Sequence, residues 1–198
     1  MSDHYAVINR LGNSPRDSAV LEVAGDAEAD VSFSVFSSTG SATRSTGSIK
    51  PPSFFVSSPN LLSSATSDTA LVQASYSAGA STAVLRQMSA GGKILVEVRP
   101  FDPQIARKFV FPLGDIGRGA WALVGNTALP GTVGTITLRY GSSTATPVGG
   151  GTVPGRGAVA VPLTVPNTQV WLECDAPVVV MLALDTGKVD EAWIPPIG

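Results

Sequence analysis

The chain has 198 residues, of which 13 are basic and 15 acidic, so charged residues make up 14% of it, against about 25% in an ordinary soluble domain. Glu and Lys total only nine and Val outnumbers Leu by 23 to 15, which argues against a helical bundle, a coiled coil and a doubly wound α/β fold. The formal net charge is −2, and the few basic residues do not supply a basic face for nucleic acid. Apolar residues make up 43% of the chain, which is enough to bury a core.

Alternation of apolar and polar residues predicts a series of short antiparallel strands. It is clearest at Val31, Phe33 and Val35, which face one way while the serines between them face the other. In chain order we expect strands at residues 19–23, 31–36, 70–76, 82–88, 94–98, 108–111, 121–124, 133–140, 158–163, 169–174 and 178–184. Turn clusters separate them at residues 37–40, 90–92, 129–131 and 149–151. This spacing predicts an all-β protein made of sandwiches or barrels.

The two halves of the chain resemble each other in pattern. The strands at 19–23 and 31–36 parallel those at 121–124 and 136–140, and residues 69–75 with the strand after them parallel residues 168–175 with theirs. We predict two tandem antiparallel β-sandwich domains, Ig-like or jelly-roll-like, related by internal duplication. One larger barrel or jelly roll is the alternative.

The predicted domains are residues 1–99 and 104–198, the second ending in a C-terminal tail. The linker between them is residues 100–103, because Pro100 and Pro103 remove ladder donors and constrain the residues before them.

Targeting and redox features are few. The first ten residues carry an acid where a signal peptide needs basic residues, and they lack an apolar stretch. The longest apolar run, residues 176–184, contains a proline and has less than half of the ~20 residues of a membrane-spanning helix. Cys174 is the only cysteine and lies in a predicted strand, which indicates a buried residue. We expect synthesis in the cytoplasm without a signal peptide, and no membrane partner.

The most catalytic-looking segment is the apolar run 178–184 followed by Asp185, Thr186 and Gly187. It resembles the strand and Asp-Thr-Gly turn of aspartic proteases, which need two such carboxylates sharing one proton. The corresponding place in the first half, residues 87–92, has no aspartate, and Asp-Thr-Gly is also an ordinary turn sequence. We interpret the segment as a turn.

Other candidate motifs are better explained by turns and loops. Residues 25–30 alternate three carboxylates, which calcium favours, but lack the spacing of a calcium loop. Residues 148–157 lack the ending of a phosphate-binding loop and predict a long flexible hairpin loop. His4 is the only histidine, which leaves too few ligands or bases for a triad or a four-ligand zinc site. A pair of carboxylates would suffice for glycoside hydrolysis, but no pair stands out. We predict no enzymatic activity, no cofactor and no metal.

Four residues are candidates for contact with a partner. Trp193 and Ile194 lie in a tail without predicted strand partners, where a tryptophan commonly anchors an interface. Arg156 is the charged residue of the glycine-rich loop. Sugar-binding sites commonly present exposed aromatic residues beside carboxylates or amides. Tyr140 is one candidate of this kind, and Trp193, which is close in sequence to Asp190, is another.

The low charge indicates a surface that relies on Ser and Thr or one that is covered in an assembly. In composition and domain style the chain resembles the small accessory proteins of tailed-phage virions, such as capsid decoration, head-fibre and tail-adaptor subunits, many of which are Ig-like or jelly-roll sandwiches. The resemblance implies a structural protein that assembles with itself as a homo-oligomer or with another structural protein, at the surface of a virion or other particle. The alternatives are a glycan or cell-surface binding module and an adaptor that binds one host protein.

Overall fold

The computed structural model describes residues 2–9, 18–36, 42–51, 55–56, 69–77, 80–88, 94–98, 105–185 and 189–193. Within these ranges the protein is all-β and contains no helix, as the composition predicts. The strands are β1 (Ser2–Asn9), β2 (Ser18–Gly25), β3 (Ala29–Phe36), β4 (Ala42–Ile49), β5 (Phe55–Val56), β6 (Thr69–Tyr76), β7 (Ala80–Met88), β8 (Ile94–Val98), β9 (Ala106–Leu113), β10 (Gly119–Asn126), β11 (Val133–Tyr140), β12 (Gly149–Pro154), β13 (Ala158–Leu163), β14 (Thr168–Asp185) and β15 (Val189–Trp193).

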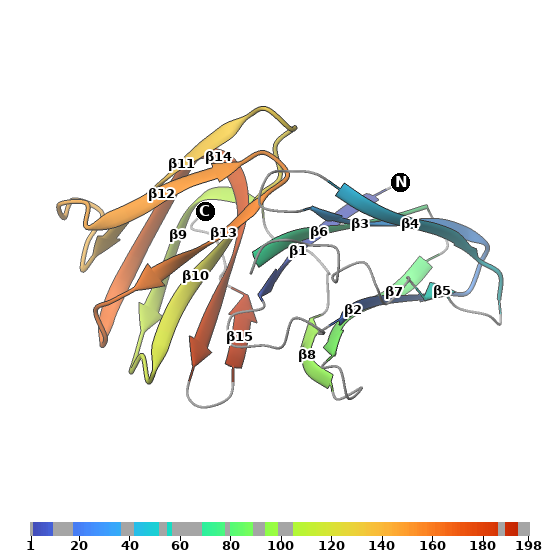
Figure 1. The fold of residues 1–198 in the computed structure, drawn as a ribbon, viewed down its shortest axis with the longest axis horizontal. Helices are drawn as coiled ribbons and strands as arrows, with labels where there is room; N and C mark the ends of the chain where they lie inside the picture. The colour runs from blue at the N-terminus through green and yellow to red at the C-terminus, as the bar shows by residue number, and fades with distance from the viewer. Residues whose placement is uncertain are drawn as a thin grey trace.

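The described strands form three antiparallel sheets. The first sheet has the order β1-β6-β3-β4 and the second the order β5-β2-β7-β8. The third has the order β12-β11-β14-β10-β13, and β9 and β15 also pair with β14. Figure 1 shows the first two sheets, in blue to green, on one side of the molecule and the third, in yellow to red, on the other. We call β1–β8 the N-terminal half and β9–β15 the C-terminal half.

The long strand β14 divides the third sheet into two leaves. Its first part pairs with β9 and β11, its second part pairs with β10 and β15, and the register shifts between Glu173 and Val178. Leaf A is therefore β9, the first part of β14, β11 and β12, and leaf B is β13, β10, the second part of β14 and β15. Side chains of both leaves enclose one buried cluster, with Phe109, Phe111, Ile136 and Leu172 from leaf A and Ala122, Val124 and Val180 from leaf B among its members.

The first sheet is buried on both faces. Residues 5–8 of β1 and 33–36 of β3 are consecutive buried residues, which an outer sheet with one wet face does not show. One face joins Val23 of the second sheet in a hydrophobic cluster and includes Ala6, Ile8, Phe33, Val35 and Val72. The other, which we call the contact face, carries Tyr5, Val7, Phe36, Leu71 and Gln73, which the ladder pairs place side by side. The first sheet is thus a middle layer.

The contact face packs on the outer side of leaf B. Leu123, Val179 and Met181 of leaf B belong to the same hydrophobic cluster as the first sheet. The approach is close at Gly125, where an added Cβ would lie 2.6 Å from Leu71 Cδ1 and 2.8 Å from Val7 Cγ2. The two halves therefore share a core, and the linker predicted at 100–103 lies outside the described residues.

Most predicted strands correspond to observed ones, and those at 94–98, 133–140 and 158–163 have the predicted bounds. The two strands predicted at 169–174 and 178–184 are one continuous strand, β14. Five strands have no predicted counterpart: β1, β4, β5, β12 and β15. The prediction of a turn at 149–151 is wrong, because these glycines begin β12. β4 and β12 are edge strands rich in Ser, Thr and Gly, residues that otherwise favour turns.

We expect Gly125→Ala to destabilise the protein by about 1 to 3 kcal/mol, because the new methyl group would overpack the contact between the halves. Gly114→Ala is the matched control, since nothing lies within 4 Å of its added Cβ. Urea unfolding followed by tryptophan fluorescence measures both variants. Equal stability of the two would show that the halves do not pack as described.

Candidate functional site

The end of β10 is organised by Asn126, a polar residue with no exposed surface. Its Nδ2 donates to the carbonyl of Val153 at 3.1 Å, and its Oδ1 accepts from the backbone N–H of Ala128 at 2.9 Å. Its backbone carbonyl accepts from the N–H of Arg156 and its own N–H donates to the carbonyl of Gly157, both at 2.9 Å. One buried residue therefore fixes the loop after β10, the end of β12 and the turn before β13.

That turn has a backbone shape with strict sequence requirements. The N–H of Gly157 donates to the carbonyl of Pro154 at 2.9 Å. A Cβ at Gly155 would collide with the carbonyl oxygen of Leu129, so the position requires glycine. Arg156 has a φ of 61°, in the left-handed region that residues other than glycine rarely adopt. The neighbouring hydrogen bonds hold Arg156 in this conformation, and its side chain reaches the N-terminal half.

Arg156 joins the two halves of the chain. Its Nη1 donates to the hydroxyl of Tyr5 at 2.5 Å and to Oε1 of Gln73 at 3.0 Å. Its guanidinium carbon lies 5.3 Å from the ring centroid of Tyr5 and 5.7 Å from that of Phe36, within the range of a cation–π interaction. The arginine thus ties the turn before β13 to β1, β3 and β6. The sequence prediction of a long flexible hairpin loop at residues 148–157 is wrong, because residues 149–154 form β12 and Arg156 lies in the hydrogen-bonded turn that follows it. The contact of Arg156 with a partner stays a prediction.

A row of polar side chains continues along the contact face from Gln73. Its Nε2 donates to Ser75 Oγ at 3.3 Å, and that hydroxyl donates to Oδ1 of Asp3 at 2.6 Å. On the same sheet, Arg44 Nε donates to Ser34 Oγ at 3.3 Å. Ser34 and Ser75 are buried, so these hydrogen bonds offset the cost of removing hydroxyl groups from water. We call these contacts, together with those of Arg156, the junction. It is a hydrogen-bonded network at the rim of the apolar contact between the two halves.

Tyr5 is held in its neutral form within this network. Burial raises the pKa of the Tyr5 hydroxyl above its ordinary value, and the hydrogen bond and positive charge of Arg156 offset only part of that rise. Asp3 adds to the rise through its negative charge. Because the usual tyrosine pKa is about 10, the phenol stays protonated near neutral pH. It therefore serves as a hydrogen-bonding group that positions Arg156.

We expect Arg156→Met to destabilise the protein by about 1.5 to 3 kcal/mol, because it removes hydrogen bonds made by a charged group. A double-mutant cycle with Tyr5→Phe should give a coupling of about 0.5 kcal/mol or more, since the two side chains touch. Arg139→Met, which breaks an ion pair on leaf A, is the control and should add to Tyr5→Phe without coupling. If the two substitutions Arg156→Met and Tyr5→Phe changed the free energy of unfolding in urea additively, this would contradict a direct contact between the two side chains.

Tyr140 is part of the fold of the C-terminal half. Its side chain packs against the cluster between the leaves, and its hydroxyl accepts from the backbone N–H of Thr164 at 2.8 Å. The side chain is half-buried and fixes the segment between β13 and β14. A contact between Tyr140 and a partner stays a prediction.

Trp193 belongs to a strand and not to a free tail. It is the last residue of β15 and pairs with Met181 of β14, so the expectation that this segment has no strand partner is wrong. The side chain of Trp193 and the whole of Ile194 lie outside what the structure describes. Their proposed contact with a partner stays a prediction.

The acidic segments that resemble motifs lie at the ends of strands. Asp26 and Glu28 are exposed between β2 and β3, and Glu28 Oε1 lies 3.5 Å from Lys50 Nζ. Asp185 ends β14 and pairs with Val189 of β15, which makes a hairpin whose residues 186–188 lie outside the described part. Among the residues that the structure describes, no group of three or more His, Cys, Asp or Glu side chains is arranged to hold a metal ion.

The residues that build the junction were not all visible in the sequence. Asn126 has a signal, because it is an isolated amide at the end of the apolar strand at 121–124. Tyr5 and Arg156 are 151 residues apart, and no spacing or periodicity relates them. Only the three-dimensional packing of the first sheet on leaf B brings them together.

Cys174 is buried, as predicted, with 4% of its surface exposed. Burial raises the pKa of its thiol, which lowers the thiolate fraction at neutral pH. We expect a thiol reagent to label native Cys174 far more slowly than the urea-unfolded chain, as measured by absorbance of the released chromophore. Equal labelling rates would show that the strand opens readily or that the thiol is accessible.

No family model, curated protein or solved structure matches this chain. In the part of the chain that is described, no helix has the length and apolar character of a membrane span.

Proposed function

We propose that the protein is a non-enzymatic structural protein, built of two tandem β-sandwich modules, that assembles with itself or onto a larger particle. The observation that carries the proposal is the burial of the contact face against leaf B, because the chain already joins two units by packing one sheet on another. Closely packed, shape-complementary faces of this kind are also what joins the subunits of stable assemblies.

The order of the strands supports an internal duplication. In the first sheet β1 pairs with β6, β6 with β3 and β3 with β4, and in leaf A β9 pairs with β14, β14 with β11 and β11 with β12. The second sheet, β5-β2-β7-β8, corresponds in the same way to leaf B, β13-β10-β14-β15. β6 and β7 then correspond to the two parts of β14. This correspondence includes the strand pairs that the sequence pattern relates.

The junction supports a role that needs a fixed shape. The shared cluster and Arg156 hold the two halves together at a set orientation, and Asn126 holds the turn that carries Arg156. A subunit of a particle must present its surfaces at constant relative positions. A rigid two-module body meets that requirement.

Exposed apolar side chains at the ends of the C-terminal half support contact with other chains. Leu129 is 70% exposed and Val133 59% exposed at one end, and Val148 is 58% exposed at the other. Leu129 begins a type II turn, with Pro130 and Gly131 at its centre, a φ of 92° at the glycine, and a hydrogen bond from the N–H of Thr132 to the carbonyl of Leu129. The turn presents its apolar tip rigidly.

The surface of a virion or other particle is the setting that we propose, on the basis of the low charge and the style that the chain shares with phage accessory proteins. A sugar-binding module is the alternative.

The proposal is tested by native mass. We expect size-exclusion chromatography with light scattering, over a wide range of concentrations and at two salt concentrations, to give a fixed multiple of the 20.2 kDa chain. An interface made of apolar faces should persist at high salt, which screens surface charges. A monomer under every condition would contradict self-assembly, and binding of that monomer to a glycan array would favour the sugar-binding alternative.

A further inference from the structure

We propose that two copies of the chain associate through β12, with the free edges of the two β12 strands pairing antiparallel about a two-fold axis. Leaf A then continues as one sheet across both copies. The inference rests on the proposed function, since it names the surface through which the protein assembles with itself.

β12 is an edge strand whose backbone is open to solvent. Among the described strands it pairs only with β11. Alternate N–H and C=O groups of an edge strand point away from the sheet, where they can pair with an added strand. Gly149, Gly150 and Gly151 are exposed. Because glycine has no side chain, that exposed surface is backbone, and another backbone can approach it closely.

β12 also lacks the features that protect the other sheet edges. Natural proteins block pairing at an edge with charged side chains, with proline or with a very short strand. Outside leaf A, each edge strand in the described part of the chain has such a feature: Asp3 in β1, Arg44 in β4, a length of two residues in β5, Glu97 in β8, Pro162 in β13 and Asp190 in β15. β12 has no charged residue, and its one proline, Pro154, is its last residue.

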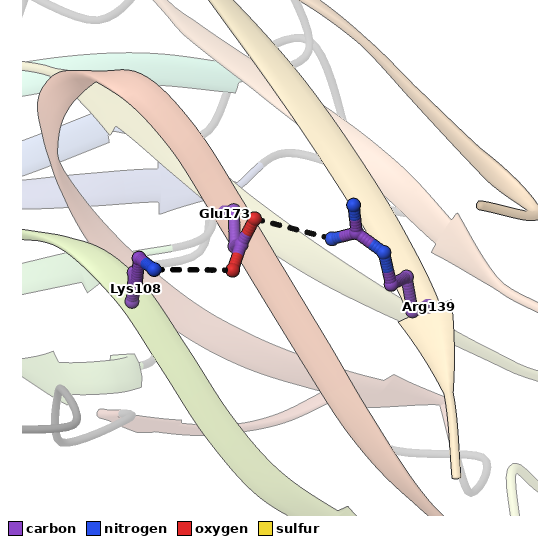
Figure 2. Close-up of polar contacts among 3 residues, drawn as sticks. All are labelled: Lys108, Arg139 and Glu173. Carbon is purple, nitrogen blue, oxygen red and sulfur yellow. Dashed lines mark hydrogen bonds and ion pairs between the residues drawn. The ribbon is translucent and has the colours of Figure 1, made fainter. Parts of the chain in front are cut away.

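The opposite edge of leaf A shows the contrast. Its strand β9 contains Arg107, Lys108 and Pro112. The side chain of Lys108 is 66% exposed, and its Nζ lies 3.5 Å from Oε1 of Glu173 in β14. Oε2 of Glu173 lies 3.1 Å from Nη1 of Arg139 in β11, which completes a charged row across three strands (Figure 2). The row ends on β11, so the β12 edge of the leaf is uncharged.

Exposed apolar side chains flank β12 at both ends. Of the five large apolar side chains that are exposed within the described residues, three lie there. Val148 directly precedes the strand. At the other end Val133 pairs with Pro154, and the carbonyl of Leu129 lies against Gly155. Antiparallel pairing of β12 with itself brings Val148 of each copy to the end where Val133 and Leu129 of the other copy lie.

A second copy is the partner that these features favour. Two identical antiparallel strands are related by a two-fold axis, so each donates and accepts the same backbone hydrogen bonds. A strand without charge also pairs with itself without repulsion between like charges. Because each copy has one β12 edge and the contact uses the same surface twice, the assembly closes as a dimer.

Cross-linking through an introduced cysteine tests the geometry. Thr152 is exposed on β12, and with a short bismaleimide we expect Thr152→Cys to give a covalent dimer with itself. Thr135→Cys is the matched control, because Thr135 is exposed on β11 and pairs directly with Thr152. In the dimer its two copies are three strand spacings apart, about 14 Å or more, and should not cross-link. Cys174 stays in place in both variants because it is buried.

A charge placed on the edge tests the chemistry. We expect Thr152→Lys to raise the dissociation constant of the dimer by about tenfold or more, because it adds like charges on both sides of the contact. Thr135→Lys adds the same charge one strand further in and should change the dissociation constant by less than about twofold. Both positions are exposed, and circular dichroism checks that both variants keep the fold. Equal weakening by the two substitutions would place the contact on the outer side of leaf A and overturn the proposal.

Light scattering and the cross-links together separate this proposal from the proposed function. An oligomer that Thr152→Lys leaves unchanged, without cross-links through residue 152, would overturn the edge pairing and leave self-assembly standing. Cross-links that form only when Thr152→Cys is mixed with Thr46→Cys, at an exposed position of β4, would overturn it in favour of pairing with the first sheet. A wild-type protein that is monomeric under every condition would overturn both proposals.

Discussion

Burial of the first sheet on both faces is the constraint on which the rest of the structure depends. Its strands are buried at consecutive positions, as residues 5–8 and 33–36 are, and not only at alternate ones. Leaf B must allow the first sheet to approach closely. It does so through small residues, namely Gly125, Ala158 and Ala160. The small residues on this surface of leaf B therefore follow from the architecture.

The polar groups at the edge of this contact must be paired, because a buried polar group without a partner destabilises the fold by about 1 to 3 kcal/mol. Arg156 donates hydrogen bonds to the side chains of Tyr5 and Gln73. The side-chain amide of Asn126 makes hydrogen bonds with backbone groups on both sides of the site that holds Arg156. The left-handed conformation of Arg156 costs about 1 kcal/mol or more. Its hydrogen bonds and its position over two aromatic rings offset that cost. The strained backbone of Arg156 is thus stabilised by contacts that exist only when the two halves are packed together.

The sequence predicts the strands whose alternation or apolar character is strong, such as β8, β11 and β13. The strands of the two halves that match each other in sequence pattern also occupy corresponding places in the order of the sheets. It does not predict β4 and β12, because Ser, Thr and Gly favour turns until tertiary pairing makes them edge strands. The alternation in β3 predicts that Ser34 faces water, but Ser34 is buried at the contact face and accepts a hydrogen bond from Arg44. The junction between Tyr5 and Arg156 escapes any local pattern, since only the docking of the two halves creates it.

Native-state hydrogen exchange at low denaturant concentrations tests most directly whether the halves share one core. The informative amides are those of β1 and β6 in the N-terminal half and of β10 and β14 in the C-terminal half. If the contact face is buried against leaf B, both groups should have the same high free energy of opening and should merge into one global unfolding transition. Opening of β1 and β6 as a separate unit at lower free energy, while β10 and β14 stay protected, would contradict the account.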